Sequence, residues 1–318
     1  MRWRWPGRRA DRPRPVVHLV DRARAGDIRA LARLLTLVES GSPDLRDVSA
    51  DLVAHTGHAH IVGITGAPGV GKSTTTSALI KALRAEGRTV AVLAVDPSSP
   101  FSGGALLGDR VRMQDHACDP GVFIRSMASR GHLGGLSAAT PQALRVLDAC
   151  GFDVILVETV GVGQSEVEVM GQADTVLVLL APGTGDAVQV AKAGILEIAD
   201  IFVVNKADRD GVHNTTRELR SMISIGDRGP DAWVPEIVTT VATRAEGIEA
   251  LVSTVERHRA WAARSGDLHS RRLERIRREI EALALDRLRD EFAGSRALAQ
   301  RVLDGELDPY TAAQSLLD

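Results

Sequence analysis

The chain has 318 residues and a formal net charge of −2, and 44% of its residues are hydrophobic while only 3% are aromatic. This length fits one large domain, or one domain of about 200 residues with additions. A near-neutral charge excludes a protein that binds nucleic acid through an overall positive charge. Two cysteines are too few for a disulfide framework. The sequence also contains no run of about 18 apolar residues, which is the length needed to span a membrane. We therefore expect a cytoplasmic protein that binds neither nucleic acid nor a membrane.

The N-terminal region divides into two parts. Residues 1–15 contain six arginines against one aspartate, and we interpret them as a disordered basic leader. They do not read as an export signal, because no apolar stretch follows the paired arginines. Residues 16–58 carry apolar residues at helical spacing, with interruptions near Gly26 and at Gly41. This pattern predicts an N-terminal helical extension of three helices before the first strand.

The most informative stretch covers residues 60–86. An apolar strand leads into a glycine-rich turn that fits the phosphate-loop pattern G-x-x-x-x-G-K-[ST], and a helix follows. Glycines let the backbone curl around a phosphate chain, and the N–H groups that open the helix attract the anion. We expect Lys72 to contact the outer phosphates and the Ser73 hydroxyl to ligate Mg²⁺. The residues expected around the phosphates are Gly66, Ala67, Pro68, Gly69, Val70, Gly71, Lys72, Ser73 and Thr74.

Further apolar runs indicate the rest of the fold. They cover residues 89–95, 122–124, 153–157, 175–180, 201–204 and 236–241. Runs without polar alternation are typical of strands buried on both faces of a parallel sheet. Because helical segments separate most of them, we predict an α/β, doubly wound fold with a mostly parallel sheet. We place this domain at residues 59–265 and a C-terminal helical arm at residues 266–318.

Three acidic residues lie where strand ends and loops should meet the phosphates. Asp96 ends the second strand, Asp109 lies in a glycine-flanked loop, and Glu158 ends the fourth strand. Mg²⁺ prefers oxygen ligands, so we expect these three carboxylates and Ser73 to form the metal shell, directly or through water. Together with Lys72, the three acids are also the candidate catalytic residues, because phosphoryl transfer depends on the charges around the transferred group.

A second motif indicates which base is bound. The residues after the apolar run 201–204 match the guanine-reading pattern N-K-x-D. An aspartate accepts hydrogen bonds from N1–H and the exocyclic amino group of guanine, whereas adenine lacks this donor pair. The three residues after the last strand stand where G-proteins place a backbone contact to the guanine oxygen. The expected base-binding residues are Asn205, Lys206, Asp208, Val241, Ala242 and Thr243.

The C-terminal arm carries a narrow apolar stripe on a charged helix. Leu273, Ile276, Ile280 and Leu283 recur at steps of three and four residues. Such a stripe packs on another helix, either in its own domain or in a second subunit. The pattern alone leaves both alternatives open.

Three histidines alternate before the first strand. His55, His58 and His60 could be taken for metal ligands, but no cysteine or carboxylate cluster accompanies them. We interpret all three as residues of a solvated turn.

The motifs taken together resemble the MeaB/ArgK family of P-loop GTPases, which are accessory proteins of adenosylcobalamin-dependent methylmalonyl-CoA mutase. The segments that carry this likeness are GAPGVGKST, VDPSSP with SGGALLGDRVRM, VETVGVGQSE, APGTGDAVQVAKAGILEIAD and VVNKAD. The resemblance implies GTP, GDP and Mg²⁺ as ligands, with Asp96 and Asp109 in the first switch and Glu158 in the second. It also implies that the loop 181–192 signals to the mutase and that the C-terminal arm forms a homodimer. The chain departs from the family in its leader and at residues 241–243, where Ser-Ala-type residues are usual.

Three functions compete at this point. The first is a GTPase chaperone whose hydrolysis gates the loading or protection of cofactor in a B12-dependent mutase. The second is a P-loop kinase or ATPase linked to arginine and ornithine transport, which would need an acceptor pocket that no motif indicates. The third is a nickel-insertion GTPase, which would carry a metal-binding segment rich in cysteine and histidine. We favour the first.

Overall fold

The computed structural model describes residues 17–97, 116, 118–129, 139–159, 170–183, 198–226, 229–292 and 295–317. These residues form two compact units, which divide between Arg271 and Arg272. The first unit contains the β-sheet and the second contains helices alone among its described residues. Each unit is described separately below. The divisions that we predicted after residues 58 and 265 stay predictions.

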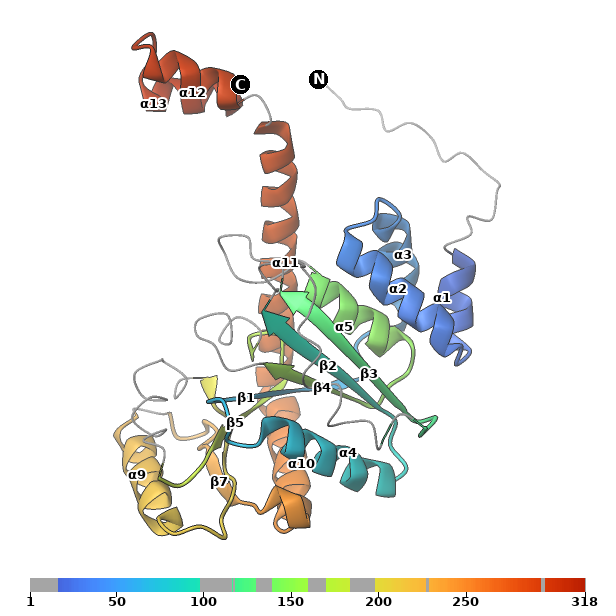
Figure 1. The fold of residues 1–318 in the computed structure, drawn as a ribbon, viewed down its shortest axis with the longest axis vertical. Helices are drawn as coiled ribbons and strands as arrows, with labels where there is room; N and C mark the ends of the chain where they lie inside the picture. The colour runs from blue at the N-terminus through green and yellow to red at the C-terminus, as the bar shows by residue number, and fades with distance from the viewer. Residues whose placement is uncertain are drawn as a thin grey trace. The chain divides into compact units, whose positions relative to one another are not determined.

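A parallel β-sheet forms the centre of the first unit (Figure 1). Its seven strands within the described residues are β1 (His60–Gly66), β2 (Val90–Pro97), β3 (Val122–Ser129), β4 (Val154–Thr159), β5 (Thr175–Leu180), β6 (Ile201–Val204) and β7 (Glu236–Thr239). They lie in the order β3-β2-β4-β1-β5-β6-β7, and every neighbouring pair is parallel. Every residue of β1, β4, β5 and β6 is buried, as expected for strands that helices cover on both faces. The doubly wound α/β prediction is confirmed.

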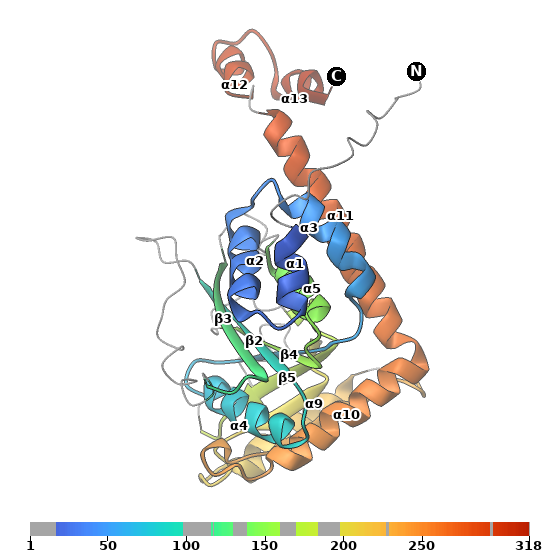
Figure 2. The same ribbon diagram turned by 90° about the vertical axis from the view of Figure 1, so that its right-hand side faces the viewer.

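Helices pack on both faces of this sheet (Figures 1 and 2). One face is covered by α5 (Ala139–Ala149), by α9 (Val212–Ile225) and by the N-terminal helices α1 (Val17–Arg24), α2 (Ile28–Ser40) and α3 (Leu45–Leu52). The other face is covered by α4 (Lys72–Ala85) and α10 (Ile248–Ser265). The sheet therefore separates two apolar cores, and its carboxyl edge remains available for a site.

The predicted N-terminal helices are confirmed, and polar side chains hold them at defined points. Asp27 caps α2 by accepting hydrogen bonds from the backbone N–H groups of Arg29 and Ala30. Gly41 ends α2 in the left-handed region, with φ 64°. Farther along, the Asp148 carboxylate in α5 accepts hydrogen bonds from three successive N–H groups of residues 57–59. This carboxylate fixes the chain between the helical extension and β1.

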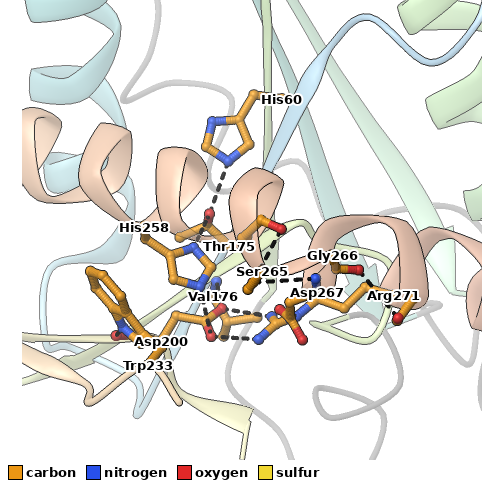
Figure 3. A network of polar contacts seen from close by, with 12 residues as sticks. His60, Thr175, Val176, Asp200, Trp233, His258, Ser265, Gly266, Asp267 and Arg271 are labelled. Carbon is orange, nitrogen blue, oxygen red and sulfur yellow. Dashed lines mark hydrogen bonds and ion pairs between the residues drawn. The ribbon is translucent and has the colours of Figure 1, made fainter. Parts of the chain in front are cut away.

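The solvated-turn interpretation is wrong for His60. This residue begins β1 and is only 2% exposed. Its Nε2 atom lies 2.9 Å from Thr175 Oγ1, and the same oxygen lies 2.8 Å from His258 Nδ1 (Figure 3). The imidazole is tolerated inside the protein because a hydroxyl on the neighbouring strand β5 bonds it.

This chain of contacts reaches α10 at His258. The buried carboxylate of Asp200 extends it to the start of α11 (Asp267–Glu291), as Figure 3 shows. His258 Nε2 lies 3.2 Å from Asp200 Oδ1. Arg271 donates two hydrogen bonds to the same carboxylate, at 2.9 and 2.8 Å. Burial opposes ionisation of Asp200, but the close approach of His258 and the two hydrogen bonds from Arg271 outweigh it and lower the pKa of Asp200.

The donors and acceptors of this chain can be assigned from the Asp200 end. An ionised carboxylate only accepts, so in the neutral form of His258 the proton lies on Nε2, toward Asp200, and Nδ1 accepts a hydrogen bond from Thr175. The Thr175 oxygen then accepts from His60 Nε2–H. This assignment leaves His60 Nδ1 as a buried acceptor without a hydrogen-bond partner in the described part of the chain. A proton added there would have no acceptor to bond with.

Two further aspartates bind a backbone N–H group at or just before the start of a neighbouring strand, as Asp200 does. Asp200 accepts a hydrogen bond from Val176 N–H at 2.8 Å. Asp174 accepts from Ile61 N–H at 3.1 Å, and Asp153 accepts from Thr89 N–H at 2.7 Å. Each aspartate lies within one residue of the strand that follows it in the chain, so these contacts fix how adjacent strands align.

The second unit contains most of α11, followed by α12 (Ser295–Leu303) and α13 (Pro309–Leu317). The four stripe residues Leu273, Ile276, Ile280 and Leu283 are 60%, 47%, 62% and 40% exposed. Among the described residues, no helix is both long and apolar enough to cross a bilayer.

The buried imidazole gives the first prediction. Burial lowers the pKa of His60 to about 4 from 6.5. Below about pH 6.5, His60 gains a proton in the unfolded chain but not in the folded chain. The free energy of unfolding therefore decreases as the pH is lowered from about 6.5 to about 4. Between about pH 7 and pH 5 this residue should cost about 2 kcal/mol of unfolding free energy. Urea unfolding at both pH values should show this loss in the wild type and a correspondingly smaller loss in His60→Gln.

The exposed neighbour His58 supplies the matched control. His58→Gln should keep the full loss of stability. An identical loss in the wild type and in His60→Gln would show that His60 is not the group that titrates.

Candidate functional site

The glycine-rich turn lies between β1 and α4, as the phosphate-loop pattern predicts. Two of its glycines are required by their surroundings. At Gly66 the backbone φ is 142°, and a Cβ would lie 2.3 Å from the Leu179 carbonyl oxygen of β5. At Gly71 φ is 100°, and a Cβ would lie 2.3 Å from Asn205 Nδ2. Only glycine therefore lets the turn pack this closely while α4 begins at the next residue, Lys72.

The predicted hydroxyl and one predicted carboxylate meet directly behind this turn. Ser73 Oγ donates a hydrogen bond to Glu158 Oε1 at 2.7 Å, although the two residues are 85 positions apart. Thr76, which the sequence analysis did not single out, donates to Glu158 Oε2 at 2.9 Å. Glu158 is 3% exposed and Ser73 is 7% exposed. The start of α4 and the end of β4 thus hold one carboxylate between two hydroxyls.

The Lys72 ammonium also lies in the turn. Its Nζ atom donates to the carbonyl oxygen of Gly66 at 2.6 Å and to that of Ala67 at 3.3 Å. The side chain is 8% exposed, so the charge is held within the loop rather than in solvent. An ammonium has three donors and no acceptor, and this position suits it to neutralise a bound anion.

These residues fit Mg²⁺ held beside a phosphate chain. Ser73 and Glu158 supply oxygen atoms, which are the ligands that Mg²⁺ prefers. Asp96 belongs to β2, where residues 94 and 95 pair with Glu158 and Thr159 of β4. Its backbone therefore lies at the same edge of the sheet. Asp109 and most of the loop 181–192 lie outside the described residues.

The N-K-x-D segment follows β6, and its first residue joins three loops. Asn205 Nδ2 donates to the Val70 carbonyl oxygen of the phosphate loop at 2.8 Å. Asn205 Oδ1 accepts from Ala242 N–H at 3.1 Å and from Thr240 Oγ1 at 3.2 Å, both beyond β7. The next residue, Lys206, has φ 58° and donates from Nζ to the Gly69 carbonyl oxygen at 2.6 Å. Both side chains thus contact protein backbone rather than an open pocket.

Asp208 is the member of this motif that faces solvent. Its side chain is 42% exposed, and Arg244 Nη1 lies 3.7 Å from its Oδ2 atom. The loop after β7 lies beside it, because Ala207 N–H donates to the Thr240 carbonyl oxygen at 3.0 Å. The N–H groups of Val241 and Ala242 are bonded within the protein, to Glu246 O and Asn205 Oδ1. Thr243 is therefore the candidate for the expected backbone contact to the base.

Sequence reasoning missed two contacts of this site. Thr76 lies three residues after Ser73 and so shares its helix face, which is a signal that could have been used. Arg244 carried no such signal, because its approach to Asp208 depends on how two distant loops pack.

The arrangement described so far defines a P-loop nucleotide site. Comparison with known proteins agrees. The family model described as "Methylmalonyl Co-A mutase-associated GTPase MeaB" matches residues 31–297. A putative GTPase of Pyrococcus abyssi is 49% identical over 307 residues, covering 94% of this chain and 95% of that protein. The GTPase ArgK of Escherichia coli is 37% identical over 311 residues, covering 93% and 94% respectively.

A solved structure is similar over nearly the whole chain. It is titled "Crystal structure of LAO/AO transport system kinase" and has a TM-score of 0.70 at 30% identity, covering 97% of this chain and 98% of that one. The chain belongs to the MeaB family of P-loop GTPases. It is accordingly a GTPase whose ligands are GTP, GDP and Mg²⁺.

The close approach of Gly71 to Asn205 gives a prediction for the site. Gly71→Ala should weaken GDP binding strongly, because its Cβ would strike Asn205 Nδ2 and because φ 100° is strained for alanine. Asn205→Ala should weaken binding by about 1–3 kcal/mol, since it leaves buried backbone groups without partners. The double variant has no clash between a Cβ at position 71 and the Asn205 side chain. Its loss of GDP affinity should therefore be smaller than the sum of the losses in the two single variants. Titration with GDP measures all three variants.

Gly69 is the matched control for this cycle. Its φ is 83°, but a Cβ there would meet nothing within 4 Å. Gly69→Ala should change GDP affinity by the same amount in the wild type and in the Asn205→Ala background. Fully additive losses for Gly71→Ala and Asn205→Ala would contradict the clamp described here.

Proposed function

We propose that this GTPase serves an adenosylcobalamin-dependent methylmalonyl-CoA mutase, and that GTP hydrolysis gates the loading of the cofactor into the mutase and its protection there. The supporting observation is the extent of the family match. It covers residues 31–297, which include most of the helical extension and the first part of the arm as well as the phosphate loop. A bare GTPase domain needs neither addition for hydrolysis, so their inclusion favours a shared partner.

The geometry supports a role for each residue near the phosphates. Mg²⁺ bound with the nucleotide neutralises negative charge on the transferred phosphoryl group. Ser73 and Glu158 would hold it, together with Asp96 and Asp109. Thr76 occupies the second oxygen of Glu158 and so fixes the rotation of this carboxylate. Lys72 would stabilise charge that develops on the phosphate oxygens.

The base and partner assignments complete the proposal. Asp208 would read guanine, while Asn205 and Lys206 hold the phosphate loop. The loop 181–192 would carry the nucleotide state to the mutase. The exposed stripe on α11 supports a homodimer, since an isolated apolar row on a charged helix commonly pairs with another helix.

A kinase of amino-acid transport is the second candidate, and the name of the similar solved structure favours it. The two candidates differ in what receives the phosphoryl group. A GTPase transfers it to water, whereas a kinase needs an acceptor molecule. Release of inorganic phosphate from GTP in buffer without any acceptor therefore favours the first candidate.

Base choice gives the next prediction. Asp208→Ala should weaken GDP binding by about 2 kcal/mol, roughly thirtyfold, through the loss of charged hydrogen bonds. The exposed Asp210 provides a control of equal charge two residues away. Asp210→Ala should leave GDP binding unchanged. Titration of the wild type with GDP and ADP tests the premise, and equal affinity for both would exclude guanine recognition.

The partner gives a further prediction. The purified chain should co-elute with a methylmalonyl-CoA mutase and should hydrolyse GTP with no acceptor added. Lys72→Ala should abolish hydrolysis, with and without mutase, yet still co-elute, because Lys72 lies in the phosphate loop and not on the surface. Lys81→Ala, an exposed lysine on the same helix, should keep both properties. Full hydrolysis by Lys72→Ala, or in EDTA, would show that the site is wrong. Failure of the wild type to co-elute would exclude this partner.

A further inference from the structure

The loop between β7 and α10 is a rigid platform beside the expected base site. Val241 N–H donates to Glu246 O at 3.0 Å, and Glu246 N–H donates back to Val241 O at 3.3 Å. The chain turns between them through η3 (Ala242–Arg244) and through Ala245, whose φ is 57°. At Gly247 a Cβ would lie 2.2 Å from the Thr239 carbonyl oxygen, so the loop returns tightly against β7. The backbone of residues 241–247 is therefore held in one conformation, which fixes the position from which each side chain extends.

Arg244 lies on this platform between two carboxylates. Its Nε atom donates to Glu246 Oε1 at 2.7 Å, and its Nη2 atom donates to Glu246 Oε2 at 3.3 Å. This two-point contact orients the guanidinium plane. The remaining terminal nitrogen, Nη1, lies 3.7 Å from Asp208 Oδ2. Glu246 thus directs the free edge of the guanidinium toward Asp208.

The distance between Arg244 and Asp208 is too long for a hydrogen bond but short enough for attraction. Among the described residues, no hydrogen bond uses either oxygen of the Asp208 carboxylate, so neither oxygen is occupied by that part of the chain. Within the described residues, Arg244 is the cation that approaches this carboxylate.

We propose that Arg244 is a positioning residue for guanine recognition, and that its charge restricts the rotation of the Asp208 side chain before the base binds. The proposal rests on the guanine-reading role of Asp208 given above. A carboxylate that is already oriented loses less side-chain freedom when it binds, which strengthens binding without a new contact to the ligand. Arg244 acts through Asp208.

The magnitude of the effect follows from exposure. The two side chains are 54% and 42% exposed, and exposed ion pairs contribute little. We expect Arg244→Gln to raise the dissociation constant for GDP about two- to fivefold at low salt. Because salt screens exposed charges, the difference should shrink at about 1 M salt. Loss of a purely structural residue would not show this salt dependence.

Orientation can be separated from general affinity with IDP, whose base lacks the exocyclic amino group of guanine. In the wild type, the ratio of the dissociation constants for IDP and GDP reports how well Asp208 meets that group. Arg244→Gln should lower this ratio, because a freely rotating carboxylate meets both donors less often. Arg244→Lys keeps the charge without the two-point contact to Glu246 and should give an intermediate ratio.

The experiment is titration of GDP and IDP at low and high salt, with thermal melting to confirm that each variant folds. Arg209→Gln is the matched control, since Arg209 follows Asp208 directly and forms no ion pair among the described residues. It should leave the ratio unchanged. In an Asp208→Ala background, Arg244→Gln should have no further effect on GDP binding.

Two outcomes would overturn the inference. Unchanged affinity and ratio in Arg244→Gln would remove any positioning role, and tighter GDP binding would mean that Arg244 competes with the base for Asp208. Either outcome counts against Arg244 only if Asp208→Ala itself weakens GDP binding. If Asp208→Ala has no effect, the guanine-reading role fails instead, so the two failures are distinguishable.

Discussion

The nucleotide site depends on the buried side-chain amide of Asn205. This residue is 3% exposed and bonds Val70, which lies 135 residues earlier, and Ala242, which lies 37 residues later. The phosphate loop and the loop after β7 are therefore connected by one side chain. Gly71 must lack a Cβ for this amide to fit. The first residue of the N-K-x-D motif thus acts as a clamp between loops, whereas Asp208 is the member of the motif that faces solvent.

The opposite edge of the sheet is fixed by three aspartate carboxylates, of which Asp174 and Asp200 are buried. Asp153, Asp174 and Asp200 each accept a backbone N–H at the start of a neighbouring strand, so the alignment of the strands is set there. In a parallel sheet this alignment also decides which residues meet at the carboxyl edge. Asp200 additionally contacts His258 and Arg271, and so connects the sheet to α10 and to the start of α11. The site depends in this way on contacts made at the far end of the strands.

The sequence predicted what local spacing determines. The strand, turn and helix of residues 60–86 and the position of the N-K-x-D segment after a buried strand follow from patterns within a few residues. The meeting of Ser73 and Glu158 was also expected, because both follow strands of one sheet. The second oxygen of Glu158, bonded by Thr76, was not expected, and neither was Arg244 beside Asp208. These contacts depend on the packing of segments far apart in the chain, which periodicity does not report.

The strand order explains how residues that are distant in the chain reach one edge of the sheet. β4 lies between β2 and β1, and Glu158 of β4 pairs in register with Ala94 of β2 and Ile64 of β1. Asp96 lies two residues beyond Ala94, and the phosphate loop begins two residues beyond Ile64. The carboxyl ends of three adjacent strands thus bring two acids and the phosphate loop to one place, although the chain between them is long. Moving β4 elsewhere in the sheet would separate Glu158 from Ser73, so the topology itself is a requirement of the site.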